Sequence, residues 1–256
     1  NSPRPKDFGA PLQNRQAIAL SVYPSKGLLL IALLFAASIT PLLTQTAKAA
    51  DDEVLDMLVE LVSSTDRDMR MLALEQIREE VPGEAATLRF VALLPKLPLA
   101  LQVELIDALG ERGDPAARPA ILKLLNSKTE AIRAVAASAL SGLASPADVA
   151  VLAELAAAGS DAEKKAARHS LRQLSGNDMN SAMCAALKDA KAKPKTELIA
   201  ALKDRKVKEA LDLVTKSAPD TDLAVRRAAL YMLRPTGEEK HTAALVQRLN
   251  SATHQT

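Results

Sequence analysis

The stretch LIDALGERGDPAARPAILKLL, residues 105–125, decides the fold. Leu105 and Leu109 are four positions apart, a spacing that puts both side chains on one face of a helix. The run Gly110–Pro115 is rich in turn-forming residues and separates this helix from the next one. Ile121 and Leu125 repeat the four-residue spacing beyond it. The stretch therefore predicts two short amphipathic helices joined by a turn.

The first of these two helical patterns recurs along the chain. Six nine-residue segments share this pattern, and their second residue is basic in five of them. This second residue recurs at intervals of 32, 31, 31, 31 and 31 residues. A fixed period of this length is typical of repeat architectures. The segments are MRMLALEQI from Met69, LQVELIDAL from Leu101, IRAVAASAL from Ile132, EKKAARHSL from Glu163, PKTELIAAL from Pro194 and VRRAALYML from Val225.

Aligned apolar columns predict the core. The ninth position of every segment is a large aliphatic residue, and the fifth is Ala or Leu. Two further columns follow in the other helix of each pair and confirm the same period. The ninth-position residues are Ile77, Leu109, Leu140, Leu171, Leu202 and Leu233, and the two other columns are Phe90, Ile121, Leu152, Met183, Val214, Leu245 and Leu94, Leu125, Ala156, Leu187, Ala218, Leu249.

Capping and turn residues lie between the predicted helices. Pro115 and Pro146 fit a first helical turn, where a missing N–H costs nothing. The run Ser175–Asp178 reads as another turn. Short polar residues that can accept from the orphan N–H groups precede four of the nine-residue segments: Asp66, Thr129, Ser160 and Asp222.

Residues 105–125 closely resemble the short HEAT-like repeats also found in phycobilisome lyase subunits, and the likeness covers about residues 51–250. The resemblance implies an all-α fold, an α-solenoid of about six to seven two-helix repeats with a period of 31 residues. Residues 50–256 are predicted to form this solenoid. A last helix over Glu239–Asn250 has no partner in this chain.

Composition agrees with helices and limits the function. Hydrophobic residues make up 48% of the 256 residues, but only three Phe, two Tyr and no Trp occur, too few aromatics for a large sheet. Residues 1–49 hold five basic residues and one acid, so the net charge of +2 leaves −2 for residues 50–256. A nearly neutral folded part argues against nucleic-acid binding by bulk charge.

The N-terminal residues read as a targeting segment. A basic leader ends at Lys26, an apolar run of about seventeen residues comes next, and Ala47–Ala49 fits a small-x-small cleavage site. We interpret residues 1–49 as a secretory signal cleaved after Ala49. The alternative is an uncleaved anchor in the inner membrane through residues 27–43. Both interpretations place residues 50–256 outside the cytoplasm, in the periplasm or the extracellular space.

No residue pattern predicts catalysis, a metal site or a cofactor. His169, His241 and His254 lack the i, i+4 spacing of metal ligands. Deoxyhypusine hydroxylase, which has similar repeats, ligates iron through His-Glu dipeptides, and no histidine here is followed by Glu. The single cysteine, Cys184, reads as a small apolar residue. The column of Arg70, Arg133 and Arg226 reads as a charge ladder between repeats, with Asp66, Glu130 and Asp222 as its acids.

We therefore expect a non-catalytic protein-binding scaffold that uses the concave face of the solenoid. The alternative is a docking arm broken from a larger exported enzyme or haem protein. In the helices that contain the nine-residue segments, positions three and seven and the residue after the segment, position ten, share a side away from the core columns. In the C-terminal half this side is basic and should dock an acidic protein segment or another polyanion. The residues predicted to bind are Lys165, His169, Arg172, Lys203, Arg227, Tyr231 and Arg234.

Overall fold

The computed structural model describes residues 52–79, 81, 83–236 and 243, without the side chains of Asn177 and of residues 234–236. The chain divides after Asp52, and the described helices belong to the unit Glu53–Thr256, apart from Asp52 at the start of the first helix. The predicted targeting segment, residues 1–49, lies outside the described residues, and so does the predicted last helix, Glu239–Asn250, except for residue 243.

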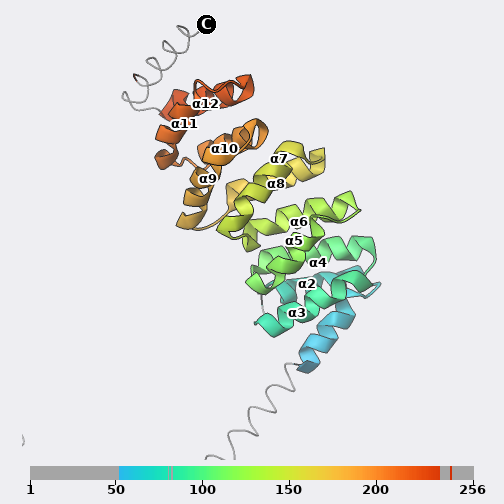
Figure 1. The fold of residues 1–256 in the computed structure, drawn as a ribbon. Coiled ribbons are helices and arrows are strands. Elements are labelled where there is room, and N and C mark those ends of the chain that lie inside the picture. Colours follow the sequence, from blue (N-terminus) through green and yellow to red (C-terminus); the bar gives the residue numbers. More distant parts are fainter. Residues whose placement is uncertain (1–51, 80, 82, 237–242, 244–256) are drawn as a thin grey trace, which may run out of the picture. The chain divides into compact units, whose positions relative to one another are not determined.

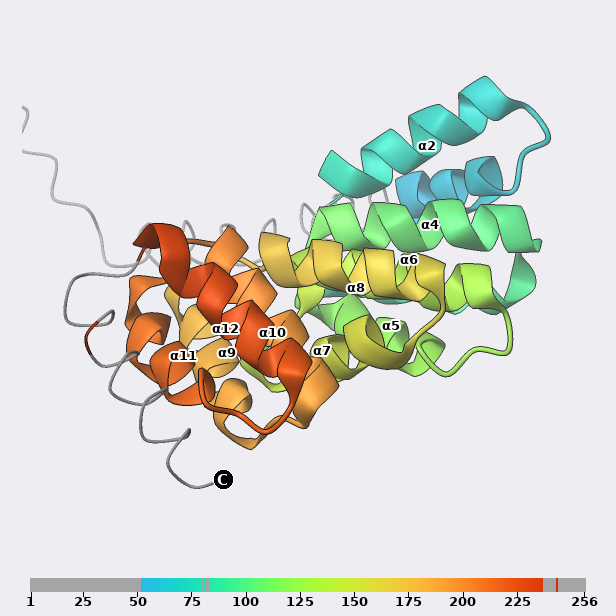
Figure 2. The ribbon, with the colours of Figure 1, turned by 90° about the horizontal axis from the view of Figure 1, so that it is seen from above.

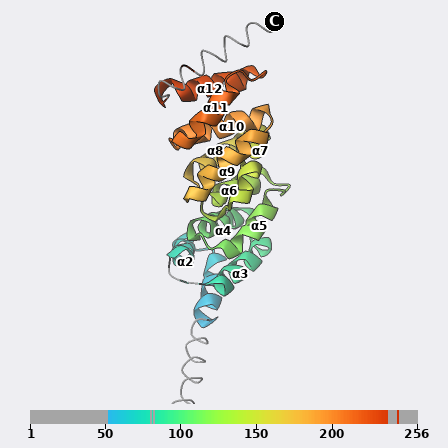
Figure 3. The same ribbon diagram turned by 60° about the vertical axis from the view of Figure 1, so that its left-hand side comes forward.

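The described residues form helices and short connections in a regular order, and no strand occurs among them. Figure 1 shows the helices following one another from one end of this unit to the other, and Figure 3 shows the same order after a turn. The elements are a helix over residues 52–62, α2 (Arg67–Glu79), α3 (Glu84–Leu93), η1 (Leu94–Lys96), α4 (Leu99–Arg112), η2 (Pro115–Ala117), α5 (Arg118–Leu124), α6 (Glu130–Leu143), η3 (Pro146–Asp148), α7 (Val149–Ala158), α8 (Asp161–Gln173), α9 (Asn177–Asp189), α10 (Ala192–Asp204), η4 (Lys208–Ala210), α11 (Leu211–Ser217) and α12 (Leu223–Thr236).

The helices form pairs that stack on one another. The six nine-residue segments fall in α2, α4, α6, α8, α10 and α12, which we call the second helices. Each second helix contacts the next one along the whole series from α2 to α12, as the view in Figure 2 shows. In four of the pairs the other helix packs against its second helix: α5 on α6, α7 on α8, α9 on α10 and α11 on α12. The helix α3 contacts η1 and η2. The prediction of an all-α solenoid of two-helix repeats is confirmed.

The predicted core columns are buried. Every ninth-position residue is at most 7% exposed, and every fifth-position residue is fully buried. In the other helices Phe90, Ile121, Leu152, Met183 and Val214 have no exposed surface. Leu125 is the exception in the second of these columns because it is only partly buried. Leu245 and Leu249 lie outside the described residues.

The turn predicted at Gly110 begins later than the sequence indicates. Gly110 is buried inside α4, and the helix ends at Arg112, where Gly113 caps it in a left-handed conformation with φ 68°. A Cβ on Gly110 would lie 2.6 Å from the Cα of Ala139 in α6. Glycine is therefore required at position 110 by the close approach of two helices, and only Gly113 marks the turn.

Three of the four predicted N-caps are confirmed. Oδ1 of Asp66 accepts from the amides of residues 68 and 69, and Asp222 caps α12 in the same way. Ser160 forms a capping box with Glu163. Thr129 occupies the N-cap position of α6 without a side-chain cap hydrogen bond, so that prediction is wrong. Pro115 and Pro146 begin η2 and η3, as predicted.

Arg70 and Arg133, two of the predicted column of arginines, form ion pairs between repeats, but their carboxylate partners are not the acidic residues predicted from the sequence. Arg70 reaches forward to Glu104 of the next repeat at 3.7 Å, and Arg133 pairs with Glu163 of the next. The same guanidinium groups donate backward to loop carbonyls, those of Ser64 for Arg70 and Ser127 for Arg133. Arg70 and Arg133 thus each connect the loop before their own helix to the second helix of the next repeat, whereas Arg226 donates to the carbonyls of Asp220 and Thr221 in the loop before α12.

Emptying the ninth-position column should destabilise the fold. Leu140 in α6 is fully buried, so Leu140→Ala should lower the free energy of unfolding by about 2–5 kcal/mol, the cost of a packed aliphatic cavity. Urea denaturation followed by circular dichroism measures the change. An unchanged midpoint would contradict the assignment of Leu140 to the core. Val151→Ala, at an exposed apolar position of α7, is the matched control and should change the midpoint little.

Glu163 links stability to pH. Its pKa is lowered by the hydrogen bond from the Ser160 amide and by Arg133, which outweigh the opposing effect of burial. A lowered folded-state pKa stabilises the fold above the unfolded value, about 4.3, and this contribution is lost as the pH falls through the folded value. Glu163→Gln should therefore cost about 1–3 kcal/mol at pH 7. The difference from wild type should shrink below about pH 4 in urea titrations; a difference independent of pH would contradict this role.

Candidate binding surface

The second helices present one continuous series of exposed or partly exposed positions. Positions three, seven and ten of each nine-residue segment lie on it, as predicted from their spacing, and among the described side chains at these positions only Gly110 is buried. Position eleven lies there as well, through Glu79, Glu111, Gly142, Gln173 and Asp204, all exposed. We call the surface formed by these four positions the inner face. Position eleven was missed in the sequence, although its spacing of four from position seven could have revealed it.

A hollow of about 420 Å³ lies on the inner face where α4, α6 and α8 adjoin. Asp107 and Glu111 line it from α4, and His169 and Gln173 line it from α8. Its floor consists of residues with small side chains: Gly110, Ser138, Ala139, Ser141 and Gly142. The hollow exists because the middle of the inner face has no long side chain to fill it.

A second hollow, of about 270 Å³, lies between α8 and α10. Arg168 forms a two-bond ion pair with Glu197 there, with nitrogen–oxygen distances of 2.8 and 2.6 Å. Arg172, one of the predicted binding residues, faces Asp204 at 3.7 Å, and both side chains remain about half exposed. The pair is therefore solvent-accessible and contributes little to stability.

The last predicted residues lie on α10 and α12. The Lys203 ammonium lies 4.3 Å from the centre of the Tyr231 ring, a cation–π contact. Tyr231 is nevertheless 64% exposed, and Arg227 is exposed one turn before it. The contact brings Lys203 and Tyr231 together, whereas Lys165 lies exposed on α8 with no acidic side chain within 4 Å among the described residues. The side chain of Arg234 lies outside the described part.

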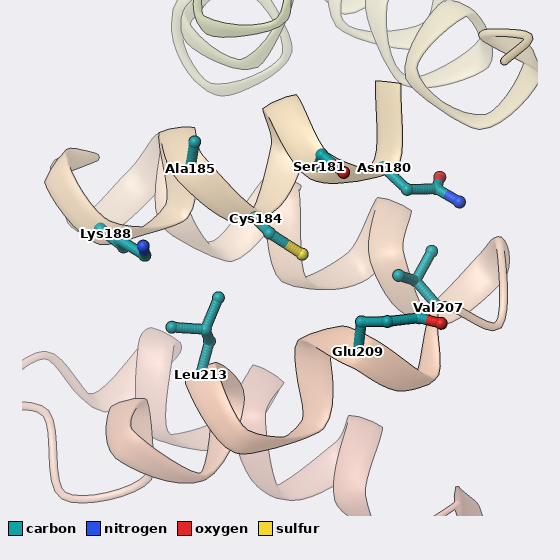
Figure 4. Close-up of a pocket in the computed structure, with 8 residues that line it drawn as sticks. All are labelled: Asn180, Ser181, Cys184, Ala185, Lys188, Val207, Glu209 and Leu213. Atoms are coloured by element: carbon teal, nitrogen blue, oxygen red, sulfur yellow. The ribbon is translucent and has the colours of Figure 1, made fainter. Parts of the chain in front are cut away.

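Cys184 lies away from the inner face, between α9 and α11. It is partly buried against the core and lines a cavity of about 560 Å³, shared with Lys188, Glu209 and Leu213. Figure 4 shows its sulfur pointing into this space. Burial and the nearby Glu209 carboxylate raise the pKa of the thiol. Cys184 is therefore a thiol rather than a thiolate at neutral pH, which is the state of an unreactive apolar side chain.

The described residues hold no cluster of His, Cys, Asp or Glu that could bind a metal ion. His169 is exposed on α8, the solvent-facing position expected from the sequence. Among the helices that the structure describes, none has both the length and the apolar character to cross a membrane.

The sequence matches the family model for HEAT repeats over residues 89–172 and 180–256. The chain belongs to the HEAT-repeat family. The helix pairs from α3 to α12 lie largely within the matched residues, and the family likeness of residues 105–125 is confirmed.

Two solved structures are similar in fold. Human deoxyhypusine hydroxylase in complex with glycerol has 15% sequence identity, a TM-score of 0.36 and coverage of 81% of this chain and 99% of the other. An engineered protein has 18% identity, a TM-score of 0.37 and coverage of 77% and 97%. At these identities the likeness concerns the fold alone. A comparison with curated proteins finds no match.

Proposed function

We propose that this HEAT-repeat chain is a protein-binding scaffold that catalyses nothing itself and holds its partner on the inner face. The observation that carries the proposal is the composition of that face: two hollows, a series of exposed charged side chains and the exposed ring of Tyr231. Stacked repeats present extended surfaces of this kind to other proteins. A fold alone does not specify function, so the proposal depends on these side chains.

Positive charge on α8, α10 and α12 supports an acidic protein segment as the partner. Lys165 and Arg227 are exposed, and neither has an acidic side chain within 4 Å among the described residues. The exposed ring of Tyr231 lies beside Lys203 and offers a rigid amphipathic contact. Tyr and Arg are enriched among the residues that contribute most to protein interfaces.

Reversing two of these charges tests the proposal. Lys165→Glu/Arg227→Glu should weaken binding of a fluorescein-labelled glutamate-rich peptide by at least about tenfold, because it places carboxylates where the peptide's carboxylates dock. Fluorescence anisotropy at low salt measures the affinity, and circular dichroism checks the fold. The control is Lys123→Glu/Lys216→Glu, the same change of charge on the exposed surface of α5 and α11. Equal binding by both variants would reject the inner face as the site.

We further propose that the repeats work outside the cytoplasm and belong to the short subclass of HEAT repeats found in phycobilisome lyase subunits. The support for export is the basic leader, the apolar run and Ala47–Ala49 in the sequence. The 31-residue period supports the subclass.

Export has a direct test. N-terminal sequencing of the protein recovered from the cell envelope should begin at Ala50, since signal peptidase would cut after Ala49. An intact leader on protein in the membrane fraction would indicate an anchor through residues 27–43 instead. An intact leader on protein in the cytoplasmic fraction would rule out export.

A further inference from the structure

The two ends of the inner face carry opposite charges. On α2 and α4 the carboxylates of Glu75, Asp107 and Glu111 surround the guanidinium of Arg78, at nitrogen–oxygen distances of 3.5, 3.9 and 2.5 Å. We call these four residues the acidic patch. The basic patch consists of the charged residues at positions three, seven, ten and eleven of α8, α10 and α12 whose side chains are described: Lys165, Arg172, Lys203, Asp204 and Arg227.

The ion pairs within the acidic patch do not neutralise it. Three carboxylates around one guanidinium leave a net charge of −2. The side chain of Arg78 is only 21% exposed, whereas those of Glu75, Asp107 and Glu111 are 55%, 50% and 58% exposed. The positive charge therefore lies beneath the carboxylates, which face the solvent. A cation approaching this end of the face meets negative charge first.

The basic patch has the opposite balance. Four cationic groups and the single carboxylate of Asp204 give it a net charge of +3. Arg172 forms an ion pair with Asp204. Lys165 and Arg227 are exposed on α8 and α12. The Lys203 ammonium stacks on Tyr231, a contact that leaves its charge intact.

The hollow over α4, α6 and α8 lies next to the acidic patch, which lines it with Asp107 and Glu111, and its floor leads toward the basic patch on α8. A Cβ on Gly142 would lie 2.3 Å from the Gly110 carbonyl oxygen, so the helices touch there through backbone. The floor between the patches therefore consists of backbone, alanine and serine hydroxyls. A partner's main chain can approach this floor closely, with Ser138 and Ser141 available as hydrogen-bonding groups.

We propose that the inner face binds one protein segment of bipolar charge, with a basic block over the acidic patch and an acidic block over the basic patch. Small or polar residues of the segment lie over the hollow between them. The inference rests on the proposed function and adds the charge order of the partner. A segment acidic along its whole length would place carboxylates against Glu75, Asp107 and Glu111, and such like-charge contacts suppress binding.

The dimensions suit a short segment. Packed helices lie about 8–10 Å apart, so the face from α2 to α12 extends over about 40–50 Å. An extended chain advances about 3.3 Å per residue, so about 12–15 residues span it. This length is enough for one block of each charge with a spacer.

Three labelled peptides of about 15 residues test the charge order on the full chain. The block peptide joins a lysine block to a glutamate block through a glycine-serine spacer, the alternating peptide has the same composition in alternating order, and the acidic peptide has serine in place of lysine. By fluorescence anisotropy at low salt, the block peptide should bind at least about tenfold more tightly than the alternating peptide. The preference should decrease as salt rises.

The variant Asp107→Lys/Glu111→Lys gives the decisive comparison. It should weaken binding of the block peptide and strengthen binding of the acidic peptide, each by at least about fivefold, because the net charge of the acidic patch changes from −2 to +2 and then has the sign of the basic patch. Loss of structure could weaken both peptides but could not strengthen either. Asp107→Asn/Glu111→Gln, which removes the charge and keeps the size, should give smaller changes in the same directions.

The outcomes separate this inference from the proposed function. If the acidic peptide needs Lys165 and Arg227 while the block and alternating peptides bind equally, the scaffold proposal stands and the charge order is wrong. If no peptide responds to changes on the inner face, both are wrong. Light scattering examines a second copy as the occupant: a dimer of the wild type that Lys165→Glu/Arg227→Glu dissociates would overturn the bipolar segment.

Discussion

The apolar columns of each repeat have to be covered by neighbouring repeats, because a two-helix unit is too small to enclose them. Leu105 in α4 and Ala136 in α6 have no exposed surface, and both second helices contact a second helix on either side. Stability therefore accumulates through contacts between adjacent repeats, as in other stacked-repeat proteins. Residues buried between two second helices pack the core, and only the exposed positions on the other side of these helices remain available for binding.

Polar contacts also connect adjacent repeats. The Arg112 guanidinium, nearly buried at the end of α4, donates to the Ile77 carbonyl at 2.7 Å and to the Thr87 hydroxyl at 2.8 Å. Arg205, the equivalent residue three repeats later, donates to the Arg172 carbonyl and to Asn180. Each arginine satisfies carbonyls at the end of the preceding second helix, where the helix itself supplies no donors. The apolar core and these arginine hydrogen bonds thus hold the same adjacent repeats together.

Periodicity predicted the helices and their buried columns well, because both depend on side-chain spacing that is visible in one chain segment. It failed where a residue's role depends on the adjacent repeat. Gly110 looked like a turn residue, but the proximity of Ala139 explains it. Arg133 was assigned an acid within its own repeat, whereas its partner is Glu163, thirty residues later. The inner face was predicted by spacing for the same reason as the core, but its hollows depend on how closely α4, α6 and α8 approach.

Position six of the second helices shows how one residue changes the contact between two repeats. At this position Leu74, Ile106, Ala137 and Ile199 are buried and Leu230 of α12 is 37% exposed, whereas α8 has a charged residue, Arg168, with 46% of its side chain exposed. Arg168 pairs with Glu197 of α10, so a charged contact replaces the apolar one between these two helices. A partly exposed ion pair contributes less than buried apolar surface. The smaller hollow opens at this junction, and the basic patch extends over both of its sides. A segment bound to that patch therefore contacts α8 and α10 together, across the junction where the Arg168–Glu197 pair takes the place of an apolar contact.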